Sequence, residues 1–406
     1  MTLVTELELP LLDPMNPELR GAAFQAEMAV VEGHDGWLAR SPFGFVTLDR
    51  ESGEFFLRSR STTFPGLTLA QLFGVTEGPL HEEITKNIIT INGADHARLR
   101  SLVNPALTPR RVDRYRPAMR EFLAGLFAAV PDDGGVEFIG EFAKPYPSQV
   151  IAHVMGAPVD DADRLHHWSS WIQRQFDPPS LMDAGTRALI DEAVSECYAY
   201  ADGLIDQRRS SPGEDLITDL IAAEEAGDRL SHDELRNLIL DILVGGVDTS
   251  QSQLSHAIRL LSAAPDQWEL LRSDPAGLAS RAVDEALRYE PITPFTARVT
   301  TEPVEHRDVS FPENTVVMVS AWHANRDGVA NPDVFDIAAE RDRARVLTFG
   351  AGIHYCVGAN LARAEIQEAL MFLAERVRRL RPDGEPEFGT PSGIYSLERL
   401  PLVLER

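Results

Sequence analysis

The amino-acid sequence predicts a mainly α-helical protein with a minor β region. Residues 112–272 show mostly the periodicity of helices, and two further helical runs follow at Ala279–Tyr289 and Ala359–Arg379. Short segments with the residue types and flanking turns of strands occur near both ends of the chain. We therefore expect a helix-rich part, at about 95–290 and 355–380, and a β-rich part, at about 35–60, 298–320 and 387–404.

The N-terminal elements come first in chain order. A helix is predicted from about Pro17 to Glu32, followed by short strands at Trp37–Ala39 and Gly44–Asp49. Residues 60–95 are rich in Gly, Thr and Pro, so we expect an irregular segment there. Since a loop of that length in a compact protein is usually functional, this segment is expected to have a functional role.

Prolines and glycines divide the rest of the chain. The predicted loops in the helical region lie at Pro145, Pro178-Pro179, Pro212-Gly213 and Gly227. Strands are predicted at Val299–Thr301, Val304–His306 and Thr315–Ser320. An irregular stretch, Asn331–Arg345, leads into a glycine-rich segment, and a last strand pair spans roughly Glu387 to Leu404.

Composition restricts the possible partners and location. The chain has 406 residues and a net charge of −25, which argues against nucleic acids and anionic membranes as partners. Two cysteines, Cys197 and Cys356, exclude a disulfide framework and fit a reducing cytoplasm. Acids and a proline interrupt the apolar N-terminus, and no segment reaches about 18 uninterrupted apolar residues. We therefore expect a soluble cytoplasmic protein without membrane insertion.

Cys356 lies in the stretch Phe349-Gly-Ala-Gly-Ile-His-Tyr-Cys-Val-Gly358, directly before the helical run that starts at Ala359. Exposed N–H groups at a helix N-terminus favour a thiolate, and glycines let a flat, bulky group approach closely. Such a thiolate suits an axial ligand of haem iron. A lone cysteine is as often a buried structural residue, but the Phe-x-x-Gly-x-His-x-Cys-x-Gly spacing argues against this. A zinc site is not expected, because no second Cys/His cluster accompanies His354 and Cys356.

Glu285 and Arg288 are three residues apart on a helix that ends before Pro291, so their side chains share a face and can pair. Taken alone, such a pair is usually a solvated surface contact of little energetic value. If the pair is buried, it needs a further partner to offset desolvation.

The apolar helix at Leu238–Ser252 contains Gly245-Gly246-Val-Asp248-Thr249. Two adjacent glycines in a helix interior cost about 1 kcal/mol each relative to alanine. We therefore expect either a close approach to this helix or a local opening of its hydrogen bonds. The neighbouring Asp-Thr pair suits proton delivery to a bound small molecule. The alternative is a loose helix end at which the same two residues are caps.

His96 and Arg100 are four residues apart and would share a helical face. Together they could clamp an anion such as a haem propionate. On their own they are a weak signal, because cationic side chains on helices are usually just solvated.

Taken in this order, the four segments resemble the cytochrome P450 family of haem-thiolate monooxygenases. The resemblance covers nearly the whole chain from His96 to the last strand pair, whereas the N-terminal 90 residues match only in general style. It implies a single domain, residues 1–406, with the cytochrome P450 fold, a triangular helix-rich prism with small β-sheets. It also implies haem b and a bacterial enzyme that inserts one oxygen atom of O2 into a hydrophobic small molecule, by hydroxylation or O-dealkylation.

The resemblance implies roles for individual residues. Cys356 is expected to be the proximal iron ligand, whose electron donation assists O–O cleavage. Thr249 and Asp248 match an alcohol–acid pair that relays protons to iron-bound dioxygen, for which Gly245 or Gly246 makes room. Glu285 and Arg288 match a pair that orders the proximal side. The other expected haem-binding residues are Phe349, Gly352 and Gly358 in the cysteine loop, and His96, Arg100, Arg298 and His354 at the propionates.

One position departs from the family pattern. The Glu-x-x-Arg pair usually gains a third arginine, four residues after the phenylalanine of a Phe-Asp motif. Here the motif is Phe335-Asp336, and position 339 is alanine. Arg341 is a candidate substitute through a shifted loop, and Arg343 and Arg345 are also near.

The family's substrate pocket maps to a mainly apolar set of residues, each of which could also be ordinary core. The candidates are Leu69, Phe73, Val75, Asp241, Val244, Gly245, Pro294, Phe295, Thr296, Ile394 and Tyr395. Asp241 lies seven residues before Asp248, on the same helical face. We expect it to meet a hydroxyl or amine of the substrate, or to pair with a nearby histidine or arginine.

Electrons must come from outside, because the chain carries no flavin or iron–sulfur motif. The resemblance implies a ferredoxin and its reductase, with NAD(P)H as the indirect source. Eight arginines map to the borders of the proximal face, where they would steer a small acidic donor. They are Arg110, Arg111, Arg114, Arg116, Arg363, Arg376, Arg378 and Arg379.

Two alternatives remain open. One is a P450-type oxidation without oxygen insertion, such as coupling, or peroxygenase activity. The other is a haem-binding sensor or carrier without turnover. Asp248 and Thr249 argue against a peroxide-dependent enzyme and against a carrier, because neither needs proton delivery.

Overall fold

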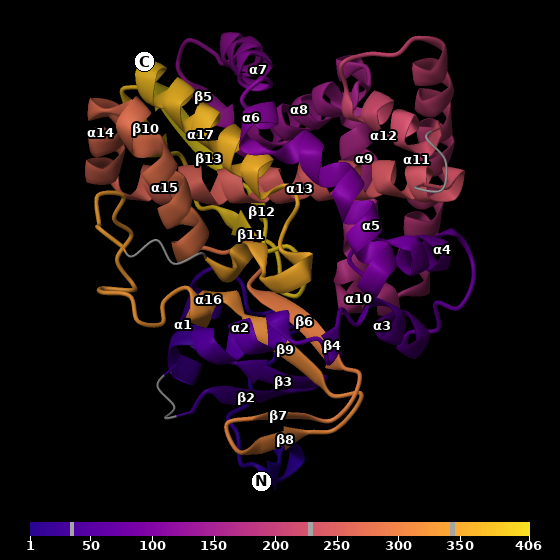
Figure 1. Ribbon diagram of the computed structural model, residues 1–406. Coiled ribbons are helices and arrows are strands. Elements are labelled where there is room, and N and C mark those ends of the chain that lie inside the picture. The colour runs from indigo at the N-terminus through magenta and orange to yellow at the C-terminus, as the bar shows by residue number, and fades with distance from the viewer. Residues whose placement is uncertain (33–35, 226–229, 342–345) are drawn as a thin grey trace.

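The computed structural model describes residues 1–32, 36–225, 230–341 and 346–406. It confirms a mainly helical protein with small β-sheets. In Figure 1 the helices form the broad upper part of the molecule, and the narrower lower part contains the largest sheet and the N-terminus. The outline tapers toward the strand-rich end, as expected for a triangular prism.

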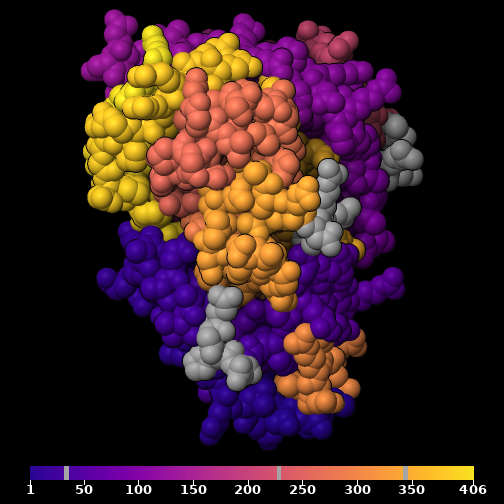
Figure 2. Space-filling view, turned by 90° about the vertical axis from the view of Figure 1, so that its left-hand side faces the viewer, coloured from indigo at the N-terminus to yellow at the C-terminus, as the bar shows by residue number. Residues whose placement is uncertain are grey.

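Helices account for most of the described residues. Their bounds are α1 Ala22–Glu32, α2 Arg50–Arg58, α3 Gly66–Leu72, α4 Pro79–Lys86, α5 Gly93–Val103, α6 Pro109–Val112, α7 Arg116–Ala128, α8 Pro145–Met155, α9 Ala162–Ile172, α10 Pro178–Met182, α11 Ala184–Ser210, α12 Leu216–Glu225, α13 His232–Ala263, α14 Pro265–Ser273, α15 Pro275–Tyr289, α16 Ala321–Ala324 and α17 Ala359–Arg376. Figure 2 shows a second face, on which the coral residues of α14 and α15 lie beside the yellow C-terminal part and above the indigo N-terminal residues.

The strands join the two ends of the chain. They are β1 Thr2–Leu3, β2 Leu38–Ser41, β3 Gly44–Thr47, β4 Thr62–Thr63, β5 Gly135–Glu137, β6 Phe295–Thr300, β7 Val304–His306, β8 Val309–Phe311, β9 Val316–Ser320, β10 Arg379–Pro382, β11 Glu387–Phe388, β12 Leu397–Arg399 and β13 Pro401–Glu405. The largest sheet has the order β2-β3-β9-β6-β4, in which β3 and β9 are parallel. Three smaller sheets have the orders β1-β8-β7, β10-β13-β5 and β11-β12.

Helix α13 is the longest of the described helices and the centre of the helical part. A capping box begins it: Ser231 Oγ accepts a hydrogen bond from the Glu234 N–H at 3.3 Å, and Glu234 Oε2 accepts one from the Ser231 N–H at 2.8 Å. Helices α8, α9, α15 and α17 pack around it, so side chains are buried on most of its faces. The glycine pair does not interrupt α13, which is continuous from His232 to Ala263.

Several sequence-based boundaries were wrong. Residues 60–95 are not irregular, because they contain β4, α3 and α4. Helix α4 begins at Pro79, and its Leu80 N–H donates to Asp191 Oδ1 at 2.8 Å. This cap comes from α11, more than a hundred residues away, so no local pattern indicates it. The predicted breaks at Pro145 and Pro178 are instead first residues of helices, where the missing N–H costs nothing.

Other differences are smaller. Strands β5, β8 and β10 were not predicted, and α17 ends at Arg376 rather than Arg379 because the chain then pairs with β13. The first helix begins at Ala22 rather than Pro17. Gly227, Arg343 and Arg345 lie outside the described residues.

Candidate functional site

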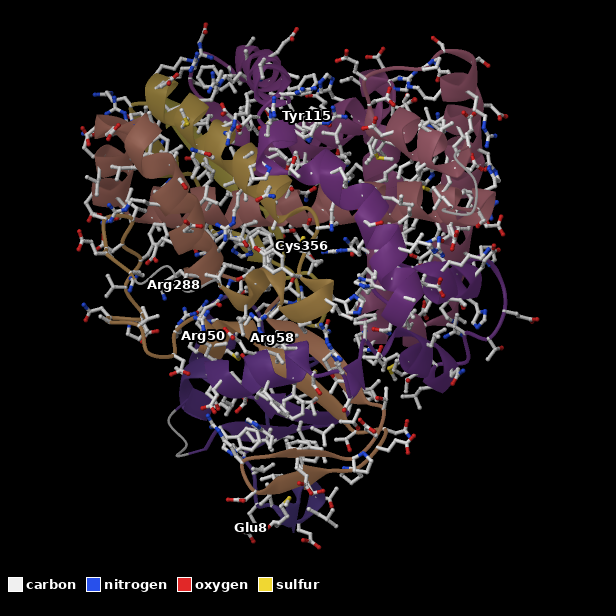
Figure 3. The ribbon with its side chains drawn as sticks, in the orientation of Figure 1. Glu8, Arg50, Arg58, Tyr115, Arg288 and Cys356 are labelled. Atoms are coloured by element: carbon white, nitrogen blue, oxygen red, sulfur yellow. The ribbon has the colours of Figure 1, made fainter. Side chains whose placement is uncertain are left out.

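Cys356 lies near the middle of the molecule (Figure 3), after the 3₁₀ turn Gly352–His354 and directly before α17. Its N–H donates to the carbonyl oxygen of Phe349 at 3.0 Å, which closes the loop. Gly352 has φ +74°, and a Cβ there would lie 2.5 Å from the carbonyl oxygen of Leu57. Only glycine fits this position, because both the backbone conformation and the contact exclude a side chain.

The Cys356 side chain lines an internal cavity and is exposed to it. Burial within the protein raises the pKa of the thiol, whereas the N–H groups of Gly358 and Ala359 and the Arg100 guanidinium lower it. The N-terminal groups of α17 therefore act in the expected direction, but burial outweighs them. A thiolate at Cys356 thus needs an additional positive charge, which a metal ion would supply.

Phe349 also lines the cavity and is held by its neighbours. Its ring centroid lies 6.3 Å from that of Tyr355, in an edge-on arrangement. The guanidinium of Arg363 lies 5.1 Å from the Phe349 ring centroid and also pairs with Asp284. The expected packing residue therefore has a fixed orientation beside the cysteine loop.

The structure brings together the four predicted propionate-binding residues. The ring centroids of His96 and His354 are 4.4 Å apart, and the Arg100 Nη2 donates to the carbonyl oxygen of Tyr355 at 2.6 Å. Burial lowers the pKa of His354 to about 3, and His96, Arg298 and Arg100 lower it further by repulsion. Burial alone lowers the pKa of Arg298 to about 10.

The two arginines of this set, Arg100 and Arg298, are cations that lack the anions that buried charges require. Arg298 is buried, and Nη1 of its guanidinium donates to the carbonyl oxygen of Ala297. Within the described residues, neither Arg298 nor Arg100 has a carboxylate at ion-pair distance, and Nε2 of the buried His96 has no partner. A ligand with two carboxylates, next to an accessible thiol, would satisfy this set, so the residues present fit haem b.

Helix α13 forms the wall of the cavity near Cys356. Gly245, Gly246 and Thr249 line the cavity, and Thr249 Oγ1 donates to the Gly245 carbonyl oxygen at 2.6 Å. A Cβ on Gly246 would lie 2.6 Å from Ile151 Cδ1 of α8, so this glycine permits close packing of two helices. A Cβ on Gly245 would meet no atom within 4 Å. The close approach expected at the glycine pair is confirmed at Gly246, whereas Gly245 faces open space.

Asp248 does not line the cavity but contacts α9. Its Oδ2 accepts from Ser169 Oγ and its Oδ1 from Ser170 Oγ, both at 3.1 Å. Both ring nitrogens of His166 lie near these side chains. Nδ1 of His166 lies 3.6 Å from Oδ1 of Asp248, and Nε2 of His166 lies 3.2 Å from Ser170 Oγ. Burial raises the pKa of Asp248 to about 6, against the two serine hydrogen bonds that lower it. Asp248 can therefore exchange a proton near neutral pH.

Glu365 is a buried acid that sequence reasoning missed. It lies on α17 with an exposed fraction of 1%, and neither carboxylate oxygen has a hydrogen bond of normal geometry. Burial raises its pKa to about 8, and the Ser250 hydroxyl lowers it. Glu365 lies next to Ser250, which follows Thr249 in the chain and lines the cavity. Glu365 therefore has access to the same region. The available signal was Glu365 and Glu368 at helical spacing among residues of α17 that are otherwise apolar and buried.

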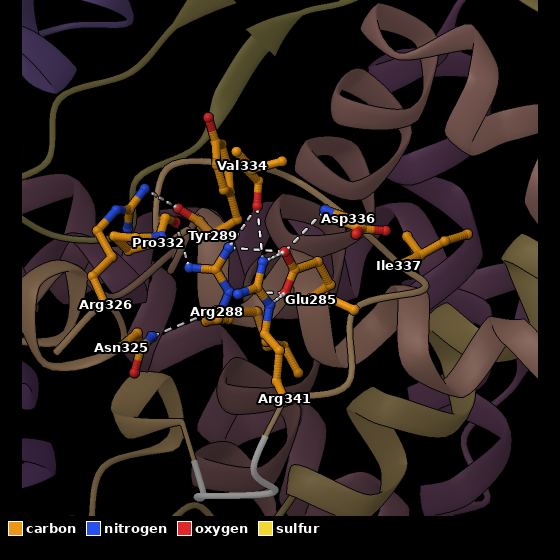
Figure 4. A network of polar contacts seen from close by, with 12 residues as sticks. Glu285, Arg288, Tyr289, Asn325, Arg326, Pro332, Val334, Asp336, Ile337 and Arg341 are labelled. Atoms are coloured by element: carbon orange, nitrogen blue, oxygen red, sulfur yellow. Dashed lines mark hydrogen bonds and ion pairs between the residues drawn. The ribbon is translucent and has the colours of Figure 1, made fainter. Parts of the chain in front are cut away.

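Glu285 and Arg288 form the centre of a buried polar network (Figure 4). Arg288 donates from Nε and Nη2 to the two carboxylate oxygens of Glu285, both at 2.8 Å. Arg341 also donates from Nε and Nη2 to both oxygens, at 2.9 Å. The Asp336 N–H donates to Glu285 Oε1 at 3.1 Å. Arg341 therefore occupies the place of the third arginine.

Carbonyl groups of the preceding loop complete this network. Arg288 donates to the carbonyl oxygens of Pro332 and Val334, at 2.7 and 3.1 Å. Arg341 donates to those of Ala330 and Val334, at 2.7 and 3.0 Å. One carboxylate thus holds two arginines, and the arginines hold the irregular segment that leads to the cysteine loop.

The cavity has a volume of about 430 Å³, within the usual range for small-molecule sites. Six predicted pocket residues line it, namely Leu69, Asp241, Gly245, Phe295, Thr296 and Ile394. Apolar residues that were not predicted complete much of the wall, among them Ile84, Ile88, Ile89, Phe176, Leu238 and Ile242. Asp241 Oδ2 accepts from the Ile88 N–H at 3.1 Å and from Asn237 Nδ2 at 3.3 Å, so it does not pair with a histidine or arginine.

Five predicted pocket residues do not line the cavity: Phe73, Val75, Val244, Pro294 and Tyr395. Val244 is buried under α9, whose Ser169 Oγ donates to the Val244 carbonyl oxygen at 3.1 Å. Tyr395 is fully buried, and its hydroxyl accepts from the Gly21 N–H at 3.0 Å. Val244 and Tyr395 are each adjacent in sequence to a residue that lines the cavity, but their own side chains point into the core.

Most of the eight arginines expected at the proximal face are engaged in ion pairs. Arg116 pairs with the buried Glu368 at 2.7 Å. Arg111, Arg363, Arg376 and Arg378 pair with Asp219, Asp284, Glu375 and Glu405 respectively. Across the part of the chain that the structure describes, no carboxylate lies at ion-pair distance from Arg110, Arg114 or Arg379.

Comparisons with known proteins agree with this site. The family model described as "Cytochrome P450" matches residues 76–274 and 277–388. The chain is 31% identical over 398 residues to luteothin monooxygenase of Streptomyces thioluteus, which covers 97% of this chain and 96% of that protein. It is 35% identical over 327 residues to vitamin D(3) 25-hydroxylase of Pseudonocardia autotrophica, which covers 78% of each.

Solved structures show the same fold. The crystal structure of CalO2 superposes with a TM-score of 0.89 at 27% identity, covering 98% of this chain and 99% of that one. In the described parts of the chain, none of the helices combines the length and the apolar character that crossing a membrane requires.

Proposed function

Because the chain belongs to the cytochrome P450 family and is a monooxygenase of that family, we propose that Cys356 holds the iron of haem b and that the enzyme oxygenates a hydrophobic small molecule. The reaction would be a hydroxylation or an O-dealkylation with one oxygen atom of O2. The observation that carries the proposal is the accessible thiol of Cys356 beside the buried Arg298 and the half-buried Arg100, neither of which has a carboxylate partner among the described residues.

Haem would supply the oxidising chemistry, namely the activation of dioxygen at its iron. The protein residues would position the group. His96, Arg100, Arg298 and His354 would bind its two carboxylates, because they form a cluster of donors without anions. Gly352 and Gly358 would shape the cysteine loop that presents Cys356 to the iron, and Phe349 would pack beside this loop.

Asp248 and Thr249 would deliver protons to the cavity. The Thr249 hydroxyl faces the cavity and donates to the Gly245 carbonyl oxygen, so its oxygen can accept a hydrogen bond from a water molecule in the cavity. Asp248 holds or releases a proton near neutral pH, since its pKa is about 6. Ser170 and His166 connect Asp248 to the α9 side of the molecule. The pair would therefore pass protons from outside α13 to its inner face.

We also propose that an external ferredoxin, reduced through its reductase by NAD(P)H, donates the electrons in the cytoplasm. Three of the eight expected arginines have no ion pair within the described residues, namely Arg110, Arg114 and Arg379. These three would attract an acidic donor. Because the other expected arginines already have carboxylate partners, the attractive surface would be smaller than the arginine count suggests. Residues 1–406 would act as one domain.

The test is spectroscopic and then catalytic. Reduced protein with carbon monoxide should show the red-shifted Soret band of a thiolate-ligated haem, and Cys356→Ala should abolish it. Cys197→Ala is the matched control, because Cys197 is buried in the core and is not among the residues that line the cavity, so its loss should leave the band unchanged. With a surrogate ferredoxin and reductase, Thr249→Ala should consume NADPH with little product. Retention of the band in Cys356→Ala would refute the ligand assignment.

A further inference from the structure

A polar cluster forms one end of the otherwise apolar cavity. It consists of Glu83 on α4, Gln175 in the 3₁₀ turn Gln173–Phe176, and Asp241 on α13. Gln175 and Asp241 line the cavity, and the fully buried Glu83 lies next to both. Each side chain has one buried polar atom with no hydrogen-bond partner: Oε2 of Glu83, Nε2 of Gln175 and Oδ1 of Asp241.

The contacts that these residues do make come from neutral groups. Glu83 Oε1 accepts from Asn87 Nδ2 at 2.6 Å. Asp241 Oδ2 accepts from the Ile88 N–H and from Asn237 Nδ2. The Gln175 amide lies beside Glu83 and lowers its pKa, although its Nε2 makes no hydrogen bond of normal geometry. Buried carboxyls normally have a cation or several donors, so this cluster has more acceptors than donors.

Among the described residues around this cluster, none supplies a compensating positive charge. Burial raises the pKa of Glu83 to about 7 and that of Asp241 well above its usual value, and repulsion by Glu83 raises the pKa of Asp241 further. Cys197 and Tyr198 of α11 are near, and burial raises the pKa of both, so they stay neutral. The guanidinium of Arg236 stacks on Tyr198 at 4.3 Å but pairs with Glu82, Asp202 and Asp233 instead.

We propose that Glu83, Gln175 and Asp241 form a subsite for a cationic nitrogen carried by an otherwise apolar substrate. This inference rests on the proposed function, since it names the substrate class of the same cavity. A cation provides both the charge and the N–H donors that the two carboxyls lack, whereas a buried water molecule provides donors only. Ile88, Leu238 and Ile242 line the cavity near this end and would contact the apolar body.

Three probes with the same apolar chain separate charge from hydrogen bonding. They are dodecylguanidinium, 1-dodecanol and dodecanoate, added to the haem-loaded protein. The guanidinium keeps its proton at any usable pH, so it cannot bind the iron through nitrogen as a free amine would. Binding is measured by the spin-state change of the haem and by calorimetry. We expect dodecylguanidinium to bind at least about tenfold tighter than 1-dodecanol, and dodecanoate to bind most weakly.

Isosteric variants locate the effect. In Asp241→Asn the preference for the cation over the alcohol should fall to about twofold or less, and Glu83→Gln should reduce it. Asp160→Asn makes the same substitution at an exposed site and should leave the preference intact. Calorimetry at pH 7 in buffers of different ionisation enthalpy should show proton release on cation binding by the wild type and less by Asp241→Asn, because the carboxyl pair is protonated beforehand.

The outcomes are separable. If the wild type binds the alcohol as tightly as the cation, or if Asp241→Asn keeps the preference, the subsite is overturned while the enzyme assignment stands. If the reduced wild type lacks the thiolate Soret band with carbon monoxide, the proposed function itself fails. The comparison of probes on the wild type needs no variant, so it decides the question even if a substitution prevents folding.

Discussion

Removal of the third arginine, Arg341→Ala, is expected to destabilise the protein less than removal of the carboxylate it binds. Arg341 donates to both oxygens of Glu285, and the exposed fractions of the two side chains are 15% and 4%. After the substitution Glu285 keeps Arg288 and the Asp336 N–H, so no buried charge is left alone. With each charge-assisted hydrogen bond worth ~1.5–3 kcal/mol and partial exposure reducing the sum, we expect a loss of about 2 kcal/mol.

The reverse change has a larger cost. In Glu285→Ala the guanidinium groups of Arg288 and Arg341 face each other without an anion, and breaking a buried pair in this way costs ~3–5 kcal/mol. Arg378→Ala is the control, because Arg378 is mostly exposed and its single ion pair with Glu405 is worth ~1 kcal/mol or less.

Urea unfolding followed by circular dichroism, together with the haem content of the purified proteins, measures this series. The expected order of unfolding midpoints is wild type and Arg378→Ala highest, then Arg341→Ala, then Glu285→Ala. If Arg341→Ala unfolds at the wild-type midpoint, the network does not depend on Arg341 as the contacts indicate. If it is as unstable as Glu285→Ala, the carboxylate does not remain compensated by Arg288.

Three further predictions concern separate parts of the site. Arg298→Ala should lose haem faster to apomyoglobin than the wild type, because a buried donor to the haem carboxylates is gone; an unchanged rate would contradict that role. In urea, Gly352→Ala should destabilise the protein more than Gly350→Ala. Both glycines have positive φ, which costs an alanine ~1–2 kcal/mol, but only a Cβ at Gly352 would contact a backbone oxygen. Equal losses of stability would contradict the effect of that contact. Glu365 should contribute up to about 1.4 kcal/mol per pH unit to a fall in wild-type stability between about pH 4.5 and 8, because native Glu365 keeps a proton that the unfolded chain has released. Glu83, Asp241 and Asp248 also have raised pKa values, so Glu365→Gln should reduce the slope by this amount without abolishing it, and a parallel slope in the variant would exclude a contribution from Glu365.

The parts of the site that follow from local pattern were predicted from sequence. The cysteine loop depends on glycines at fixed offsets, and the Glu285–Arg288 contact depends on helical spacing. The apolar helix at Leu238–Ser252 was predicted from its own pattern, although α13 extends beyond it at both ends. In each case the residues that define the feature are close together in the chain, so a single sequence contains the information.

The features that were missed depend on contacts between distant segments. Asp191 caps α4 from α11, and this cap turns part of a stretch predicted as irregular into a helix. Val244 and Tyr395 were assigned to the cavity, but the packing of α9 and of the N-terminal residues directs them into the core. The environment of Asp241 needed Ile88 and Asn237 to be placed, and the first of these is about 150 residues away. No spacing rule covers such contacts.

Tyr395 connects the beginning of the chain with its end. The Tyr395 hydroxyl accepts a hydrogen bond from the Gly21 N–H, and the Tyr395 N–H donates to the Ile292 carbonyl oxygen at 2.7 Å. The preceding residue, Ile394, lines the cavity. Gly21 and Tyr395 are 374 positions apart, so this wall cannot close until the chain has left the ribosome as far as Tyr395. Contacts of such sequence separation form late and slowly. A nascent chain therefore exposes an open apolar cavity until Tyr395 emerges, and the timing of haem insertion relative to that moment determines whether the cofactor meets an open or a finished pocket.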